Sequence, residues 1–344
     1  MDRSPRGYTR AAARHYIWLR FQHTDVISDA MSPSPKSLIV DLLSTLPRSA
    51  EGAMPVRALV AAGDCFGIAE NSIRVALARL CAAGTVARDE RGRYRLGERT
   101  EATRREVASW RTRHEDVGDW AERRWTGVLA APRGARAPRT RATRRERALL
   151  LLGFRRFDAN LFLRPDNLAG GTPRTRERLA ALDPSVAADG SLVTSLSDLD
   201  AETEQRALGL WNGDEAVAAY DFSRRALAES EKRVEDLSRA EAMVETFLVG
   251  GQVLRQIALD PLLPEDIVPG RERARLVDAM RRYDRLGRAC WAGFLEAFDV
   301  PHMRTPADVR VADAPLSMAA LSTLRETPVS SPSSISIPDS GVRS

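Results

Sequence analysis

The sequence has few of the residues that build disulfide frameworks, metal sites and catalytic triads. Its 344 residues include three cysteines and four histidines. Cys65, Cys81 and Cys290 lie far apart without CxxC spacing, so they predict reduced thiols in a protein core, as in the cytoplasm. The histidines lack the paired spacing that metal or triad chemistry needs. They are His15, His23, His114 and His302.

Long apolar runs and phosphate-binding loops are also missing. No run reaches the roughly 18 apolar residues of a membrane span. No apolar stretch follows the arginine-rich N-terminus, as it would in a secretory signal. The motif GxxxxGK(S/T) is absent, and Gly170-Gly171 alone does not make a phosphate loop. We therefore expect a cytoplasmic protein that binds no membrane, no cofactor and no metal.

Lysine is nearly absent, since Lys36 and Lys232 are the two lysines among 52 basic residues. The arginines that replace it are unevenly distributed. Residues 1–156 carry a net charge of +13 and residues 157–344 a net charge of −8, within a total of +5. A basic first half beside an acidic second half favours contact between the first half and a polyanion such as DNA.

Three helices followed by a basic hairpin are predicted near the N-terminus. Apolar spacing indicates helices over 37–46, 55–62 and 70–83. Residues 85–96 have strand-like ends around a charged turn that contains a glycine. This order of elements is the plan of a winged helix-turn-helix.

The third helix is expected to have one apolar and one polar face. A 3.6-residue period puts Ile73, Leu77 and Leu80 on the packed face. The outer face combines small residues for close approach with Asn, Arg and Ser for base edges and phosphates, and the hairpin tip adds two arginines. The alternative is a solvated helix face without DNA. The candidate DNA-binding residues are Asn71, Ser72, Arg74, Val75, Arg79, Arg91 and Arg93.

The rest of the chain predicts an α+β middle region and a helical C-terminal region. Residues 125–130, 157–163 and 191–196 are strand-like. Helices over 144–152 and 174–182 separate them, an order typical of a ferredoxin-like α+β sandwich. Long helices are then expected over 215–237, 239–257 and 271–298.

The length predicts two or three domains. Met31 precedes a Ser-Pro-Ser-Pro run, so either the natural chain starts there or the residues before it form a helical arm. The expected units are an extension or disordered arm over 1–33, a winged helix-turn-helix DNA-binding domain over 34–100, a linker helix over 101–119, a ferredoxin-like middle domain over 120–200, a C-terminal helical domain over 205–300 and a largely disordered tail over 301–344.

Motifs in three regions carry a resemblance to a known family. They are SLIVDLL (37–43) with GIAENSIRVALARL (67–80) and Gly84, then LGF (152–154) and FLRPDN (162–167) with Trp120 and Trp125, and last LRQIALDPLLP (254–264) with Trp291 and Phe294. In this order they resemble the PaaX family, bacterial repressors of phenylacetic acid catabolism. The resemblance covers roughly residues 34–299.

The resemblance implies a homodimer that represses a catabolic operon and leaves its operator DNA when an aryl-CoA thioester such as phenylacetyl-CoA binds. It also implies a middle domain shaped like the small CRISPR-associated integration nucleases. Two features depart from the family. Ala69 stands where such helices usually carry a Ser or Thr N-cap, which is worth about 1 kcal/mol. The many arginines around 133–147 leave the identity of the effector open.

A CoA thioester needs cations for its phosphates, and an aryl group needs an aromatic surface. Arg suits phosphate through its bidentate fork. The candidate effector-binding residues are therefore Arg133, Arg136 and Arg139, from the densest basic cluster, together with Trp125. The alternative is a solvated loop beside a tryptophan of the domain core.

The function expected is that of a DNA-binding transcriptional regulator, a repressor of a catabolic operon released by an aryl-CoA or related acyl-CoA effector. One alternative is a Mg²⁺-dependent nuclease built on Asp119, Asp158 and Asp166 of the middle domain. Because the strand over 124–131 carries no acid, we expect no enzyme. The other alternative is a DNA-binding accessory protein that responds to no ligand.

Overall fold

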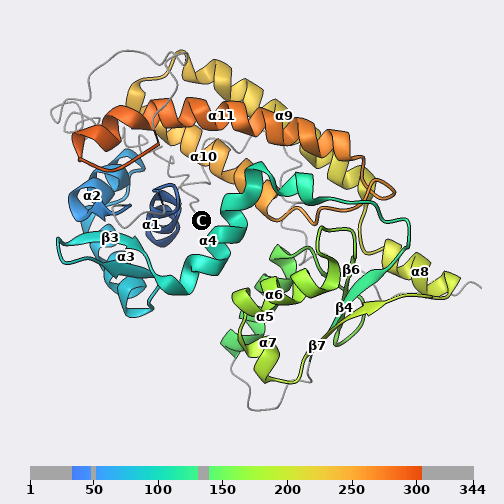
Figure 1. Ribbon diagram of the computed structural model, residues 1–344. Helices are drawn as coiled ribbons and strands as arrows, with labels where there is room; N and C mark the ends of the chain where they lie inside the picture. Colours follow the sequence, from blue (N-terminus) through green and yellow to red (C-terminus); the bar gives the residue numbers. More distant parts are fainter. Residues whose placement is uncertain (1–32, 48–51, 131–138, 304–344) are drawn as a thin grey trace, which may run out of the picture.

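The computed structural model describes residues 33–47, 52–130 and 139–303. They form a structure of helices and two antiparallel sheets, which confirms that the protein is α+β (Figure 1). The arm expected over 1–33 and the tail expected over 301–344 fall almost entirely outside these residues. Within the described ranges, every helix is too short or too polar to span a membrane.

The N-terminal unit (residues 34–100) holds three helices and a three-stranded sheet. Its elements are α1 (Pro35–Ser44), β1 (Met54–Pro55), α2 (Val56–Cys65), α3 (Glu70–Ala82), β2 (Val86–Arg88) and β3 (Arg93–Leu96). The antiparallel strand order is β1-β3-β2. Ser34 caps α1 by accepting a hydrogen bond from the Ser37 amide. The three predicted helices and the hairpin are confirmed, but α2 continues to Cys65, and β1 is too short for its pattern to show in the sequence.

The linker (residues 98–116) is a short helix between 3₁₀ turns rather than one long helix. Its elements are η3 (Glu98–Thr100), α4 (Glu101–Ala108), η4 (Ser109–Arg111) and η5 (Arg113–Asp116). Arg104 donates to the Leu46 carbonyl of the N-terminal unit at 2.6 Å. Glu106 pairs with Arg178 of the middle unit, and Arg111 pairs with Asp284 near the C-terminus. The linker is therefore bonded to three parts of the molecule.

The middle unit (residues 120–200) is a four-stranded antiparallel sheet with helices on one face. Its elements are β4 (Trp125–Leu129), α5 (Arg139–Leu151), β5 (Arg155–Arg156), β6 (Leu161–Pro165), α6 (Gly171–Leu182), α7 (Ser185–Ala188) and β7 (Leu192–Leu196), and its strand order is β5-β6-β4-β7. The prediction of one strand over 157–163 is wrong. The amides of Phe157 and Asp158 both donate to the Leu161 carbonyl, and this turn divides the segment into the hairpin β5–β6.

The helical unit (residues 201–300) holds α8 (Ala201–Leu208), α9 (Gly213–Val234), α10 (Arg239–Ala258) and α11 (Gly270–Ala297). The three long helices are confirmed to within a few residues. Ser238 and Glu241 form a reciprocal capping box at the start of α10. Helix α8 was not predicted, because only Ala207 among its residues is buried and its apolar pattern is correspondingly weak.

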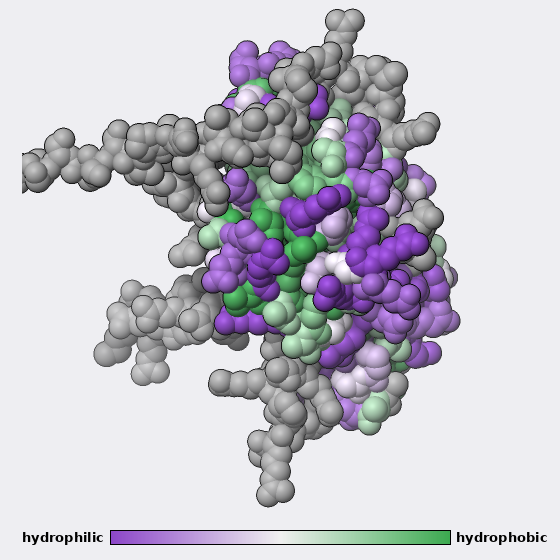
Figure 2. Space-filling view, turned by 90° about the vertical axis from the view of Figure 1, so that its left-hand side faces the viewer, coloured by the Kyte–Doolittle hydropathy of each residue, from purple (hydrophilic) through white to green (hydrophobic). Residues whose placement is uncertain are grey.

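Helices α10 and α11 join the cores of the other two units. One buried cluster combines Leu38 and Ile73 of the N-terminal unit with Trp291 and Phe294 of α11. A second combines one face of the middle sheet with α9, α10 and α11. Figure 1 shows these three helices side by side, with the N-terminal unit under one end and the middle unit under the other. Figure 2 views the end nearer the N-terminal unit, where hydrophobic residues gather between hydrophilic ones.

Gly153 of the middle unit lies close against the segment between α10 and α11. Its φ is +82°, and an added Cβ would lie 2.8 Å from both Cα and O of Pro261. Gly190 has a similar φ of +78° but open space around the Cβ position.

We expect Gly190→Ala to cost about 1–2 kcal/mol of unfolding free energy from backbone strain alone. Gly153→Ala should cost a further 1–3 kcal/mol, roughly, from the clash. Urea titrations of both variants test this, and equal losses would contradict it.

Candidate nucleic-acid interface

Helix α3 separates a buried from an exposed face as the sequence predicts. Ile73, Leu77 and Leu80 are buried, and Ala76 lies beside them. Asn71, Ser72, Arg74, Val75 and Arg79 are all exposed. The N-cap residue Ala69 makes no side-chain hydrogen bond, so the start of α3 lacks a side-chain cap. The candidate residues on α3 therefore share one accessible surface.

The arginines of this surface differ in their partners. Arg74 pairs with Glu70 one turn earlier at 2.7 Å, and both side chains are more than half exposed. Such an exposed pair contributes at most about 1 kcal/mol, so a phosphate could replace Glu70 as the partner of Arg74. Arg79 and Arg91 are exposed and have no ion-pair partner among the residues that the structure describes. Both are therefore available for an anionic partner, as are the exposed Arg88 and Arg95 of the hairpin strands.

The hairpin tip is built by Asp89 and Gly92. The Asp89 carboxylate accepts a hydrogen bond from the Arg93 amide at 2.7 Å, and Gly92 takes a φ of +75°. Glycine adopts this left-handed conformation without the steric cost of a Cβ. The turn leaves Arg91 exposed at the tip, in the position that the sequence predicts.

Arg93 has a different role from the phosphate contact expected for it. Its Nη2 donates to the Ala53 carbonyl at 2.9 Å and to the Asp299 carbonyl at 2.7 Å. The half-buried side chain thus holds the hairpin against the strand before α2 and against the end of α11. Arg93 and Arg95 lie two residues apart on β3 and so share one face of the strand, yet Arg95 is exposed and Arg93 is half-buried. No local pattern in the sequence distinguishes Arg93 from Arg91, because the partners of Arg93 are carbonyls far along the chain.

In the described part of the chain, the candidate effector residues do not lie together in one site. Trp125 is 1% exposed and lies between Trp120 and Trp211, at ring-centroid distances of 5.0 and 6.1 Å. It is a core residue. Arg133 and Arg136 lie outside the described residues, and Arg139 is the first residue of α5, with its side chain also outside them.

Two of the three carboxylates of the nuclease alternative have structural partners. Asp158 accepts from the Ala159 amide at 2.7 Å, and Asp166 accepts from the Thr172 hydroxyl at 3.1 Å. Over the described ranges, no group of three or more His, Cys, Asp and Glu side chains could hold a metal ion. The arrangement offers no support for metal-dependent cleavage.

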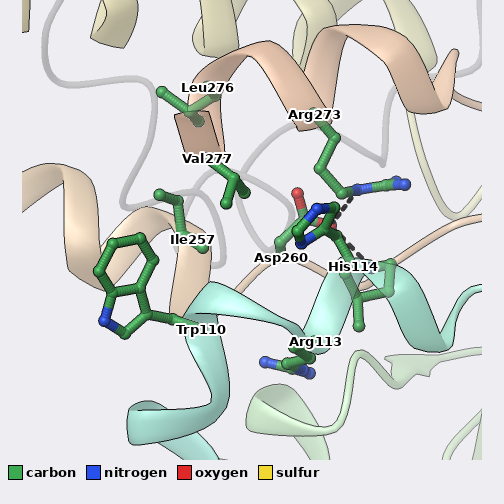
Figure 3. Close-up of a pocket in the computed structure, with 9 residues that line it drawn as sticks. Trp110, Arg113, His114, Ile257, Asp260, Arg273, Leu276 and Val277 are labelled. Carbon is green, nitrogen blue, oxygen red and sulfur yellow. Dashed lines mark hydrogen bonds and ion pairs between the residues drawn. The ribbon is translucent and has the colours of Figure 1, made fainter. Parts of the chain in front are cut away.

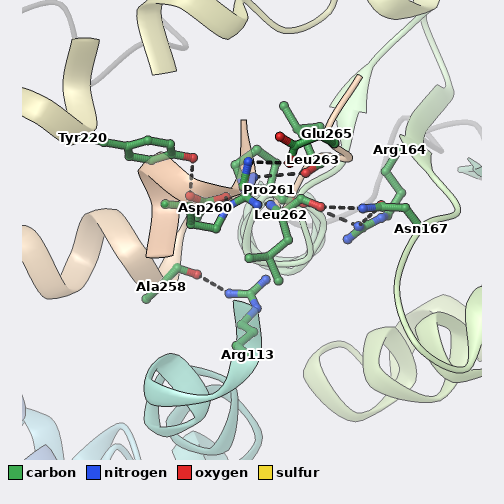
Figure 4. Close-up of polar contacts among 12 residues, drawn as sticks. Arg113, Arg164, Asn167, Tyr220, Ala258, Asp260, Pro261, Leu262, Leu263 and Glu265 are labelled. Carbon is green, nitrogen blue, oxygen red and sulfur yellow. Dashed lines mark hydrogen bonds and ion pairs between the residues drawn. The ribbon is translucent and has the colours of Figure 1, made fainter. Parts of the chain in front are cut away.

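The domain junction (residues 258–264) is the segment that follows α10. Figure 4 shows side chains from the linker and from the middle and helical units converging on it. Asp260 accepts hydrogen bonds from the Tyr220 hydroxyl at 2.5 Å and from Arg273 Nε at 3.2 Å. Burial alone would lower the pKa of Arg273, but the Asp260 carboxylate and Tyr220 raise it. Burial also raises the pKa of Tyr220, so its hydroxyl remains a donor.

Two further buried arginines bind helix ends instead of carboxylates. Arg113 donates to the Ala258 carbonyl at 2.6 Å and to the Leu151 carbonyl at 3.0 Å. Arg164, 1% exposed, donates to the Leu152 carbonyl and to Asn167 Oδ1. Burial, with the nearby charges of Arg113 and Arg178, lowers the pKa of Arg164 to about 9. These carbonyls end α5 and α10, where the helix dipole is negative, so the arginines satisfy acceptors that the helices leave free.

Two cavities adjoin these elements. One lies at the junction and is lined by Trp110, Arg113, His114 and Arg273 among others (Figure 3). Its volume of about 10 Å³ accommodates roughly one water molecule, so it is too small for an organic effector. The other is an open groove of about 470 Å³ between α9 and α11. Four arginines line it: Arg224, Arg225, Arg275 and Arg282.

Comparison with known proteins places the N-terminal unit in a family. Residues 34–100 match the family model described as PaaX-like protein, which confirms the predicted resemblance over this unit. Among solved structures, this chain is similar to the uncharacterized protein Rv0674 from Mycobacterium tuberculosis, at 23% identity and a TM-score of 0.45. That alignment covers 76% of this chain and 99% of the other. Comparison with curated proteins finds no match.

The two contacts of Arg93 predict what its loss does. Arg93→Ala removes the donor to the Ala53 and Asp299 carbonyls, so the hairpin over 86–96 should open more often. We expect faster amide hydrogen exchange in peptides from this hairpin and from residues around 299. Arg91→Ala, which removes an exposed arginine from the same turn, is the control and should leave exchange unchanged. Unchanged exchange in Arg93→Ala would show that the anchor does not hold the hairpin.

Proposed function

We propose, on the premise that residues 34–100 match the PaaX-like family, that this chain is a DNA-binding transcription regulator. The N-terminal unit would act as a winged helix-turn-helix, with α3 in the major groove and the β2–β3 hairpin as the wing. The observation that carries the proposal is the exposed polar face of α3 beside Arg79 and Arg91. The net charge of +13 over residues 1–156 supports it, because phosphate contacts supply most non-specific affinity.

The residues of this interface would bind different parts of the DNA according to their side-chain chemistry. Asn71 and Arg79 carry groups that pair with the edges of adenine and guanine. Ser72, Arg74 and Arg91 would bind phosphates and so fix the register on the duplex. Arg93 would support the wing from behind through its two carbonyl contacts.

Regulation would come from the rest of the chain. The βαββαβ order and the sheet order of the middle unit support a ferredoxin-like domain. We propose a cytoplasmic homodimer that represses a catabolic operon from a palindromic operator. An aryl-CoA or related acyl-CoA effector would release it by binding a DNA-incompetent arrangement more tightly. The open groove between α9 and α11 is lined by four arginines and by Asp278, and these arginines support it as a second place for the effector phosphates.

The test of regulation is an anisotropy titration on the duplex upstream of the protein's own gene, with and without a panel of aryl-CoA thioesters. We expect specific binding that one ester reverses. Arg282→Ala and Arg225→Ala should raise the ester concentration needed if the groove holds its phosphates. Specific binding that no ester changes would refute the effector, and binding no tighter than to random DNA would refute the regulator.

Replacing Arg79 and replacing Arg91 should weaken DNA binding in different ways. Arg79→Ala should lose about 1–3 kcal/mol on the specific duplex and little on random DNA, because it removes a base contact. Arg91→Ala should weaken both duplexes alike and reduce the slope of log K against log salt by about 1, because it removes a phosphate contact. Affinities over a salt series separate the two effects. Equal loss on both duplexes for Arg79→Ala would contradict its role in reading bases.

A further inference from the structure

Val75 is an apolar side chain on the polar face of α3. It is 41% exposed and is one of the few large apolar side chains in the described residues that lie open to solvent. Its side chain contributes little to the core, and a β-branched residue lowers helix propensity slightly. Folding stability therefore gives no reason for valine at this position, where an exposed helix surface usually carries a polar residue or alanine.

The place of Val75 on the helix is central to the candidate interface. It follows Asn71 by four residues and precedes Arg79 by four, so the three side chains lie in one row along α3. Successive members are about 6 Å apart along the helix axis, since each residue rises about 1.5 Å. The residues beside the row, Ser72 and Ala78, are small and exposed. Val75 therefore lies between the two side chains proposed to read bases, with small residues on either side of the row.

The chemistry of valine selects among the bases. Valine has no hydrogen-bond donor or acceptor, so against the edge of guanine, adenine or cytosine it would leave buried polar groups unpaired. Thymine alone among the four bases presents an apolar group in the major groove, its C5-methyl. We propose that Val75 recognises a thymine C5-methyl, located between the base pairs that Asn71 and Arg79 contact. This inference rests on the proposed function and adds one base to its specificity.

The test begins with selection of binding duplexes from a randomised library by the full chain. Each thymine of the selected duplex is then replaced singly by deoxyuridine, which keeps every hydrogen-bonding group and lacks the methyl. At one thymine per half-site, the unmodified protein should bind about fourfold more weakly after replacement, the effect of one methyl group leaving an apolar contact. Val75→Ala should bind the thymine and uracil duplexes nearly equally.

Two control variants separate this contact from other effects. Val75→Thr keeps a methyl group on the same branch and should retain most of the discrimination between thymine and uracil. Phe222→Ala removes another exposed apolar side chain, 47% exposed on α9, and should leave the discrimination unchanged. Circular dichroism melts of all variants establish that they are folded, which is expected because the replaced side chains are exposed.

The outcomes distinguish the inference from the proposed function. Selection that enriches no sequence would overturn both. An enriched duplex on which no thymine replacement weakens binding would leave the regulator standing and overturn the contact with Val75. The contact is overturned equally if Val75→Ala discriminates thymine from uracil as strongly as the unmodified protein does.

Discussion

The arrangement of the three units depends on the hydrogen bonds that two buried arginines make to the carbonyl ends of helices. Arg113 comes from the linker and Arg164 from the middle sheet, and together they bind the ends of α5 and α10. Neither has a carboxylate within hydrogen-bonding distance among the described residues. Burying an arginine without an ionic partner is costly, so removing any of these acceptors would leave a buried charge uncompensated. The geometry of the junction is therefore tightly specified.

The junction and α11 connect the middle unit to the candidate interface through rigid parts. Arg273 at the start of α11 binds Asp260 of the junction, and the carbonyl of Asp299 just beyond its end accepts from Arg93 of the hairpin. A helix of 28 residues spans about 42 Å at 1.5 Å per residue. A displacement at the junction would thus be carried along one helix to the base of the β2–β3 hairpin. This physical continuity gives the proposed effector a route by which it could bias DNA binding.

Much of the local structure was predictable from the sequence, while the junction was not. The 3.6-residue spacing of Ile73, Leu77 and Leu80 fixes which face of α3 is packed, and the predicted bounds of the long helices hold to within a few residues. Such periodicity is local, so one sequence suffices. The hairpin β5–β6 was not predicted, because the alternation of apolar and polar residues continues through its turn. The roles of Arg93, Arg113 and Arg164 depend on carbonyls far along the chain, and no local pattern marks an arginine that will be buried.

The shared core of the N-terminal and helical units has a consequence for synthesis. The N-terminal unit leaves the ribosome before α11 does, yet its buried cluster includes Trp291 and Phe294 of that helix. Until α11 emerges, this cluster lacks those rings and part of its apolar surface stays uncovered. Nascent chains of this kind bury such surface late and rely on chaperones meanwhile. The N-terminal unit thus completes its buried core only after α11 has been translated.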